Sequence, residues 1–112
     1  MQSQESRFII KRIQVAISPW KDVVISKIMF GGTCFLYKGK MCASESKGRL
    51  MVRVMSSKME RAIENPDVLP MDFTGKVMKE FIFVSEEGFD TEEKLQNWVE
   101  LGIEHAKSKI NG

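Results

Sequence analysis

The residues best suited to chemistry are two cysteines, one arginine and one histidine. Cys34 and Cys42 lie close together in the sequence, Arg53 follows them, and His105 lies far away near the C-terminus. A tetrahedral metal site needs four ligands in one small volume, which these side chains do not supply. Arg53 beside Cys42 would lower the pKa of the thiol and favour a nucleophile. No histidine lies near Cys42 in sequence, so we favour a packing role for Cys42 and a boundary position on a surface helix for His105.

Two further patterns are typical of structure rather than catalysis. Gly31-Gly32 lacks the lysine and hydroxyl residue that complete a phosphate loop, and both of its flanks are predicted as strands. The acidic pairs at 86–87 and 92–93 fall in a turn and at a helix start, where carboxylates favour the helix dipole. We therefore expect no catalytic residue, no metal and no cofactor.

The composition is that of one globular domain spanning residues 1–112. The chain is 43% hydrophobic and 29% charged, and its net charge of +2 gives no electrostatic footprint for nucleic acid. Direct nucleic-acid binding therefore stays a minority hypothesis. No apolar run approaches the roughly 18 residues that a membrane span needs, and the polar N-terminus is unlike a signal peptide. These features favour a cytoplasmic protein with free thiols and no membrane contact.

The elements that must position these residues predict an α+β fold. Helical spacing of apolar residues predicts helices over 6–17, 57–64 and 90–109. Runs of β-branched and aromatic residues predict strands over 23–30, 33–37, 40–45, 49–55 and 80–84. The segment 67–79 is expected to be irregular because Pro70 and Gly75 interrupt it. The order of helix, four-strand meander, helix, strand and helix predicts a two-layer sandwich: an antiparallel sheet of about five strands with helices on one face.

The proposed turns decide which side chains share a face of the meander. Two-residue loops at 38–39 and 47–48 place Cys42 opposite both Phe35 and Arg53. The two cysteines then point to opposite faces and cannot form a disulfide, although a three-residue loop would reverse this parity. One face is expected to be a core set: Cys34, Leu36, Met41, Ala43, Leu50, Val52 and Val54. The opposite face is rich in residue types enriched at interfaces, and its candidate interaction surface comprises Phe35, Tyr37, Cys42, Met51, Arg53 and Met55.

Four sequence blocks resemble the N-terminal domain of the TfoX/Sxy family, whose members are regulators of competence-specific genes. The blocks are "MFGG" at 29–32, "MC" at 41–42, "RLMVRV" at 49–54 and "PMDFTG" at 70–75. Besides Arg53, the matching positions most worth testing are Phe30, Gly31, Gly32, Met71, Asp72 and Phe73. Family members often carry a glycine shortly after the last block, where this chain has Glu80. The resemblance implies a two-layer α+β fold similar to secretion chaperones and a non-enzymatic regulatory role.

The leading functional hypothesis is a non-enzymatic interaction domain linked to transcription through protein contacts. The resemblance implies cooperation with a transcription regulator such as the cyclic-AMP receptor protein, and the mixed sheet face also suits pairing with a second copy as a homodimer. The alternative is a small-ligand binder or an enzyme, with a pocket formed by Cys42, Arg53 and the loop 70–75.

Overall fold

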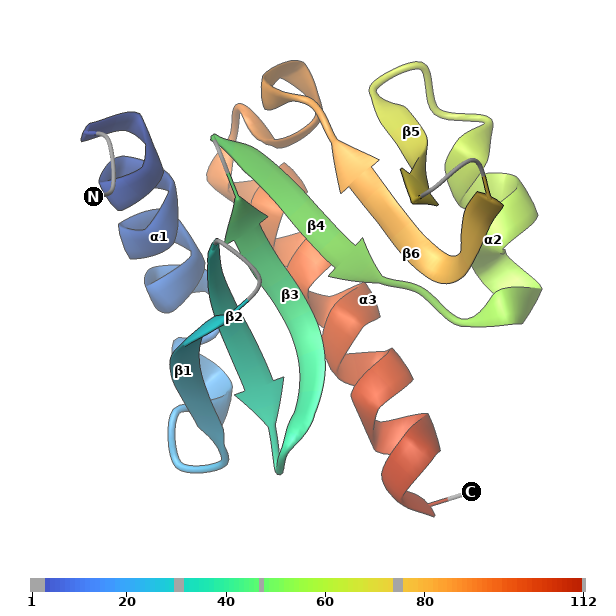
Figure 1. Ribbon diagram of the computed structural model, residues 1–112. Coiled ribbons are helices and arrows are strands. Elements are labelled where there is room, and N and C mark those ends of the chain that lie inside the picture. Colours follow the sequence, from blue (N-terminus) through green and yellow to red (C-terminus); the bar gives the residue numbers. More distant parts are fainter. Residues whose placement is uncertain (1–3, 30–31, 47, 74–75, 112) are drawn as a thin grey trace.

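The computed structural model describes residues 4–29, 32–46, 48–73 and 76–111, and Figure 1 shows how their elements are arranged. The helices are α1 (Gln4–Ala16), α2 (Ser56–Ile63) and α3 (Glu92–Asn111), with short 3-10 helices η1 (Ser18–Trp20) and η2 (Glu86–Phe89). The strands are β1 (Val24–Met29), β2 (Gly32–Tyr37), β3 (Lys40–Ser46), β4 (Arg49–Arg53), β5 (Val68–Phe73) and β6 (Lys76–Val84).

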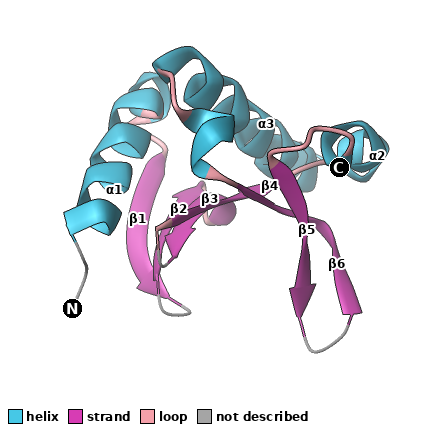
Figure 2. Cartoon of the chain, turned by 90° about the horizontal axis from the view of Figure 1, so that it is seen from above, coloured by secondary structure: helices cyan, strands magenta, loops and turns pink. Residues whose placement is uncertain are grey.

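The strands form one sheet in the order β1-β2-β3-β4-β6-β5, and every neighbouring pair is antiparallel. Figure 2 shows the helices gathered on one side of this sheet, while the other side carries none in the described part of the chain. The predicted two-layer α+β fold with helices on one face is therefore confirmed.

The sheet has six strands rather than about five, because the segment predicted to be irregular forms part of a hairpin. Residues 68–73 are strand β5, and β6 begins at Lys76, four residues before the predicted start. The strand order places β5 at the edge of the sheet. An edge strand tolerates the missing N–H of Pro70, so the proline that argued against a strand is accommodated there.

The turn at 38–39 is confirmed, whereas residue 47 of the next turn lies outside the described residues. Lys38 and Gly39 both have positive φ, 48° and 87°, and Tyr37 pairs with Lys40 across them. This is the backbone of a two-residue hairpin turn that glycine favours at its second position. The next loop likewise joins paired residues, Ser46 and Arg49.

A β-bulge at Cys42 overturns part of the predicted register. Leu36 pairs with Met41 as expected, but Phe35 pairs with Ala43, so Cys42 is the extra residue between them. The bulge reverses the parity of β2 relative to β3. Phe35, Tyr37 and Cys42 consequently belong to the buried core cluster instead of an open face, and the face prediction for these residues is wrong.

The bulge lies where the backbone of α3 comes close to β3. A Cβ on Gly102 of α3 would stand 2.2 Å from the carbonyl oxygen of Cys42, a distance that no side chain permits. Only glycine lets the helix backbone lie against this strand. The core between the layers is closed by apolar residues of α1, α3 and the inner sheet face, with Ile13, Leu50 and Val99 each fully buried.

Candidate functional site

The predicted interaction surface is divided between the core and the outside of the protein. Phe35, Tyr37 and Cys42 are at most 8% exposed and pack in the core. Met51 and Arg53 are half-buried and alternate with the core residues of β4, which places them on the sheet face that carries no helix. Met55 follows β4 as the N-cap of α2.

Cys42 is a packing residue, which confirms the role favoured from the sequence. Cys42 is fully buried, its Sγ donates a hydrogen bond to the Phe35 carbonyl at 3.4 Å, and burial raises the pKa of its thiol to about 12. The β3–β4 pairs run from Ala43–Val52 to Ser46–Arg49, so the expected cross-strand pair with Arg53 does not form. The expected contact between Cys42 and Arg53 is therefore wrong, and the buried thiol is a poor nucleophile. Cys34 is also buried, its Sγ lies 3.4 Å from Ser44 Oγ, and the two cysteines form no disulfide, as predicted.

The family-motif residues are described only in part. Phe30 and Gly31 lie outside the described residues, as does the tip of the 70–75 loop, residues 74–75. Met71, Asp72 and Phe73 have a described backbone, in β5, but their side chains lie outside the described part. Gly32 begins β2, and a Cβ there would lie 2.1 Å from the Glu45 carbonyl oxygen. Glycine is required at this position by the close approach of β3.

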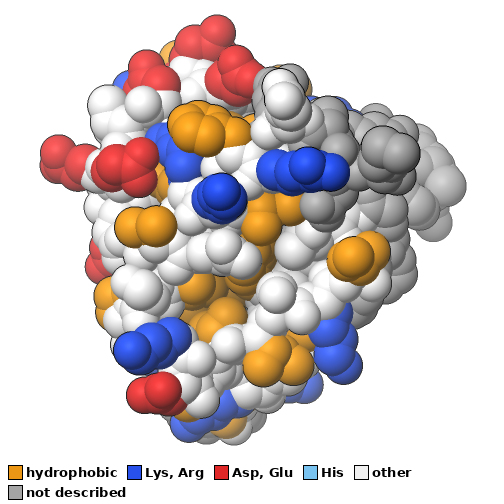
Figure 3. Space-filling view, turned by 90° about the vertical axis from the view of Figure 1, so that its left-hand side faces the viewer, with side chains coloured by type: hydrophobic (Ala, Val, Ile, Leu, Met, Phe, Trp, Pro, Cys, Tyr) orange, Lys and Arg blue, Asp and Glu red, His pale blue; other side chains and the backbone are white. Residues whose placement is uncertain are grey.

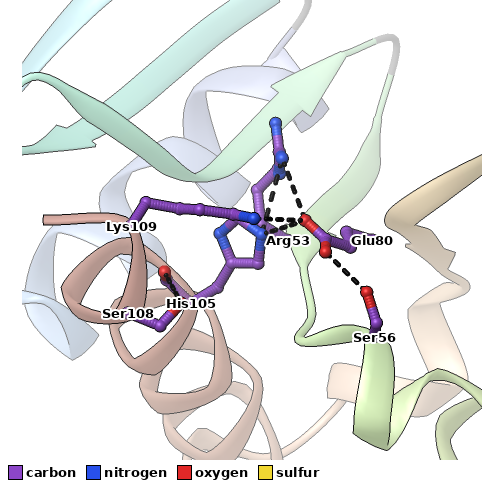
Figure 4. A network of polar contacts seen from close by, with 6 residues as sticks. All are labelled: Arg53, Ser56, Glu80, His105, Ser108 and Lys109. Atoms are coloured by element: carbon purple, nitrogen blue, oxygen red, sulfur yellow. Dashed lines mark hydrogen bonds and ion pairs between the residues drawn. The ribbon is translucent and has the colours of Figure 1, made fainter. Parts of the chain in front are cut away.

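One polar cluster joins the sheet to two helices, and we call it the Glu80 network: Arg53, Ser56, Glu80, His105 and Lys109 (Figure 4). The Glu80 Oε1 atom lies 2.7 Å from His105 Nε2, 3.3 Å from Lys109 Nζ and 3.6 Å from Arg53 Nη2. The other carboxylate oxygen, Oε2, accepts a hydrogen bond of 2.6 Å from Ser56 Oγ. One carboxylate thus connects β4, β6, α2 and α3.

These contacts keep the Glu80 carboxylate ionised. The hydrogen bond from Ser56, then that from His105, and then Lys109 lower the pKa of Glu80 from 4.5 to about 2, against the opposing effect of burial. Burial lowers the pKa of Arg53, and the charge of Glu80 opposes that shift. A carboxylate with so low a pKa is a poor general base near neutral pH. The network is therefore suited to holding elements together rather than to proton transfer.

His105 is the central buried group of the network and not a boundary residue. It is 2% exposed, and its short contact identifies Nε2–H as the donor to Glu80. The other ring nitrogen, Nδ1, is buried and has no hydrogen-bond partner among the described residues, and the same holds for Nε of Arg53. The sequence held one signal for this site, because His105 and Lys109 are spaced i, i+4 on one helix face. Their partner Glu80 could not be identified from that spacing.

Glu80 also has an unusual backbone. Its φ is +67°, in the left-handed region that favours glycine. The β4–β6 pairs end beside it at Arg53–Phe81, and its carbonyl accepts a hydrogen bond from Val54 N at 3.1 Å. A non-glycine residue in this region costs about 1 kcal/mol or more. The four side-chain contacts of its carboxylate offset that cost.

The helix-free face of β4 and β6 carries a second arrangement, which we call the Arg–Phe face: Arg49, Met51, Arg53, Phe81 and Phe83. The Arg49 guanidinium lies 4.4 Å from the centre of the Phe83 ring, and that of Arg53 lies 4.1 Å from the centre of the Phe81 ring. Met51 is the cross-strand partner of Phe83. Arg49 is exposed and the other four residues are half-buried. Two stacked cations thus flank a strip of aromatic and thioether side chains.

Two other kinds of site are missing from the described ranges. No three His, Cys, Asp or Glu side chains there come close enough to hold a metal ion. No helix within those ranges combines the length and apolar character that crossing a membrane requires.

The sequence of this chain matches the model of one protein family. The model of the TfoX N-terminal domain matches residues 16–106, which include every strand and most of α3. No curated protein matches the chain in sequence.

Proposed function

Because the chain belongs to the TfoX N-terminal domain family, we propose that it is a non-enzymatic, cytoplasmic regulatory domain that acts on transcription by binding another protein. The proposed partner is a transcription regulator such as the cyclic-AMP receptor protein, which the resemblance to competence regulators implies. The family match supports the class of protein, and the Arg–Phe face supports the mode of action.

The Arg–Phe face is the observation that carries the proposal. Arginine, phenylalanine and methionine are enriched at protein interfaces, and arginine and large aromatic groups often dominate their binding energy. Stacking on Phe83 and Phe81 holds each guanidinium in place, so less side-chain entropy is lost when a partner binds. Within the described ranges, Arg49 has no carboxylate partner. A complementary partner would present carboxylates around an apolar centre.

Reversing one charge on this face tests the proposal. The purified chain would be titrated calorimetrically with the cyclic-AMP receptor protein of the same organism in the presence of cyclic AMP. We expect Arg49→Glu to weaken binding at least about tenfold, because like charges then oppose each other. Lys11→Glu is the matched control, since it reverses an exposed charge of α1 in the helix layer.

Two outcomes contradict the proposal in different ways. If the unmodified chain does not bind, the proposed partner is wrong. Capture from native cytosol with Arg49→Glu and Lys11→Glu would then show whether any other protein depends on Arg49. If binding occurs and both variants bind equally well, the Arg–Phe face is not the binding surface.

A further inference from the structure

Strand β1 is an unpaired sheet edge with open hydrogen-bonding groups. Its neighbour on one side is β2, and no strand of the described part of the chain lies on the other. Lys38 N donates to the Val23 carbonyl at 2.8 Å, which directs the backbone of Val23 toward β2. Because direction alternates along a strand, the N–H and C=O groups of Val24, Ser26 and Ile28 point away from the sheet. None of these groups has a partner among the described residues.

The side chains around this edge are apolar and exposed. Ile25 is 55% and Ile28 80% exposed, and Phe8 and Val15 of α1 are 64% and 67% exposed. Figure 3 views the molecule from the side on which Figure 1 places α1 and β1, and hydrophobic side chains gather there. Natural edge strands are usually blunted by proline or charge. The opposite edge, β5, contains Pro70, whereas Lys27 is the one charged residue of β1.

We propose that β1 pairs antiparallel with β1 of a second copy of this chain, with the two-fold axis at Ser26. Only this register joins all three outward residues: Ser26 pairs with its copy, and Val24 pairs with Ile28 in both directions. Each such pair exchanges two backbone hydrogen bonds, so the register forms about six. A two-fold axis at Ile25 or Lys27 would form about four.

Charge favours the same register. An axis at Lys27 would set the two lysines directly opposite each other, where like charges are destabilising. With the axis at Ser26, each Lys27 lies opposite Ile25 of the other copy, and Val24 lies opposite Ile28. The dimer then continues the sheet across both molecules. Stable interfaces bury about 1,200–2,000 Å², so Phe8 and Val15 on the same side are expected to contribute beyond the strand pair.

The oligomeric state of the full chain tests the dimer. Sedimentation would be measured over about 5–500 µM protein, with reductant present. We expect a dimer of twice 12.8 kDa. Ser26→Pro removes the central donor from each copy, and Ile28→Lys adds a charge opposite Val24. Each is expected to raise the dissociation constant at least about tenfold. The monomer should tolerate both changes, because the Ser26 N–H points to solvent and Ile28 is 80% exposed.

A matched control and a residue-level measurement complete the test. Leu69→Lys places the same charge on the other edge strand, where Leu69 is 61% exposed, and is expected to leave the dimer intact. Amide hydrogen exchange should show the Val24, Ser26 and Ile28 amides protected in the unmodified dimer and unprotected in Ile28→Lys. A monomer at every concentration, or a dimer that only Leu69→Lys disrupts, would overturn the inference. Titration of Ile28→Lys with the cyclic-AMP receptor protein separates this surface from the Arg–Phe face, because we expect that binding to persist.

Discussion

Removing the charge of Glu80 is expected to destabilise the fold and to abolish one part of its acid sensitivity. Glu80→Gln keeps the size and backbone position of the side chain but leaves Arg53 and Lys109 without their shared carboxylate. The pKa of Glu80 falls from 4.5 to about 2 on folding. In full, such a shift corresponds to about 3 kcal/mol. The carboxylate is partly exposed, at 18% of its side-chain area, so solvent screening reduces this to about 1–2 kcal/mol.

The sign of the pH dependence follows from the depressed pKa. Between pH 4.5 and about 2 the unfolded chain binds a proton at Glu80 that the folded chain does not. Stability from this group is therefore complete above pH 4.5 and is lost as the pH falls through that window. We expect the unmodified chain to lose about 1–2 kcal/mol there from Glu80 alone. Glu80→Gln should lack that loss and start from a correspondingly lower stability at pH 7.

Urea unfolding followed by tryptophan fluorescence at several pH values measures both quantities. Glu104→Gln is the matched control, because Glu104 pairs with Lys58 in an exposed ion pair at 2.7 Å. Its loss should cost less than about 1 kcal/mol at pH 7. Glu80 does not stabilise the fold through its charge if Glu80→Gln is as stable as the unmodified chain at pH 7, or if the variant shows the same decline between pH 4.5 and 2.

Two further predictions concern the contact between α3 and the sheet. Gly102→Ala should lower the free energy of unfolding by about 2 kcal/mol or more in urea titrations, because its Cβ would overlap the Cys42 carbonyl at 2.2 Å; unchanged stability would show that the helix can move away. Cys42 should resist iodoacetamide in the folded protein near neutral pH and react after unfolding, since burial raises its pKa to about 12. Rapid modification in the folded state, detected by mass spectrometry, would contradict that assignment.

The features that could be predicted from sequence are those fixed by neighbouring residues. The Lys38-Gly39 turn was identifiable because glycine readily takes a positive φ and lies here between two strand-like runs. The first and last helices, α1 and α3, could be predicted from the helical spacing of their apolar residues. Strand β5 was not predicted because Pro70 lacks the N–H that a central strand needs. At a sheet edge that N–H is not required, and β5 is an edge strand.

The features that could not be predicted depend on residues far apart in the chain. Nothing within β3 marks Cys42 as a bulge, since the bulge lies against Gly102, which comes much later in the sequence. The same holds for Glu80. This residue has a left-handed backbone and lies in β6, whereas its partner His105 lies in α3. Because side chains alternate with period two, one unforeseen residue in β3 was enough to exchange the faces of Phe35, Tyr37 and Cys42.

The Glu80 network and the Arg–Phe face are physically connected through one side chain. Arg53 Nη2 is 3.6 Å from Glu80 Oε1 and 3.4 Å from His105 Nε2, while the same guanidinium stacks 4.1 Å above Phe81. His105 is anchored in the core by α3, so the position of this arginine depends on how the helix lies on the sheet. A residue fixed in this way loses little conformational entropy on binding. Arg49, by contrast, is positioned by Phe83 alone among the described contacts. At one end of the Arg–Phe face, Arg53 is fixed by contacts with the core, and at the other end Arg49 is held by one ring. A change at Glu80 would therefore release Arg53 and leave Arg49 in place.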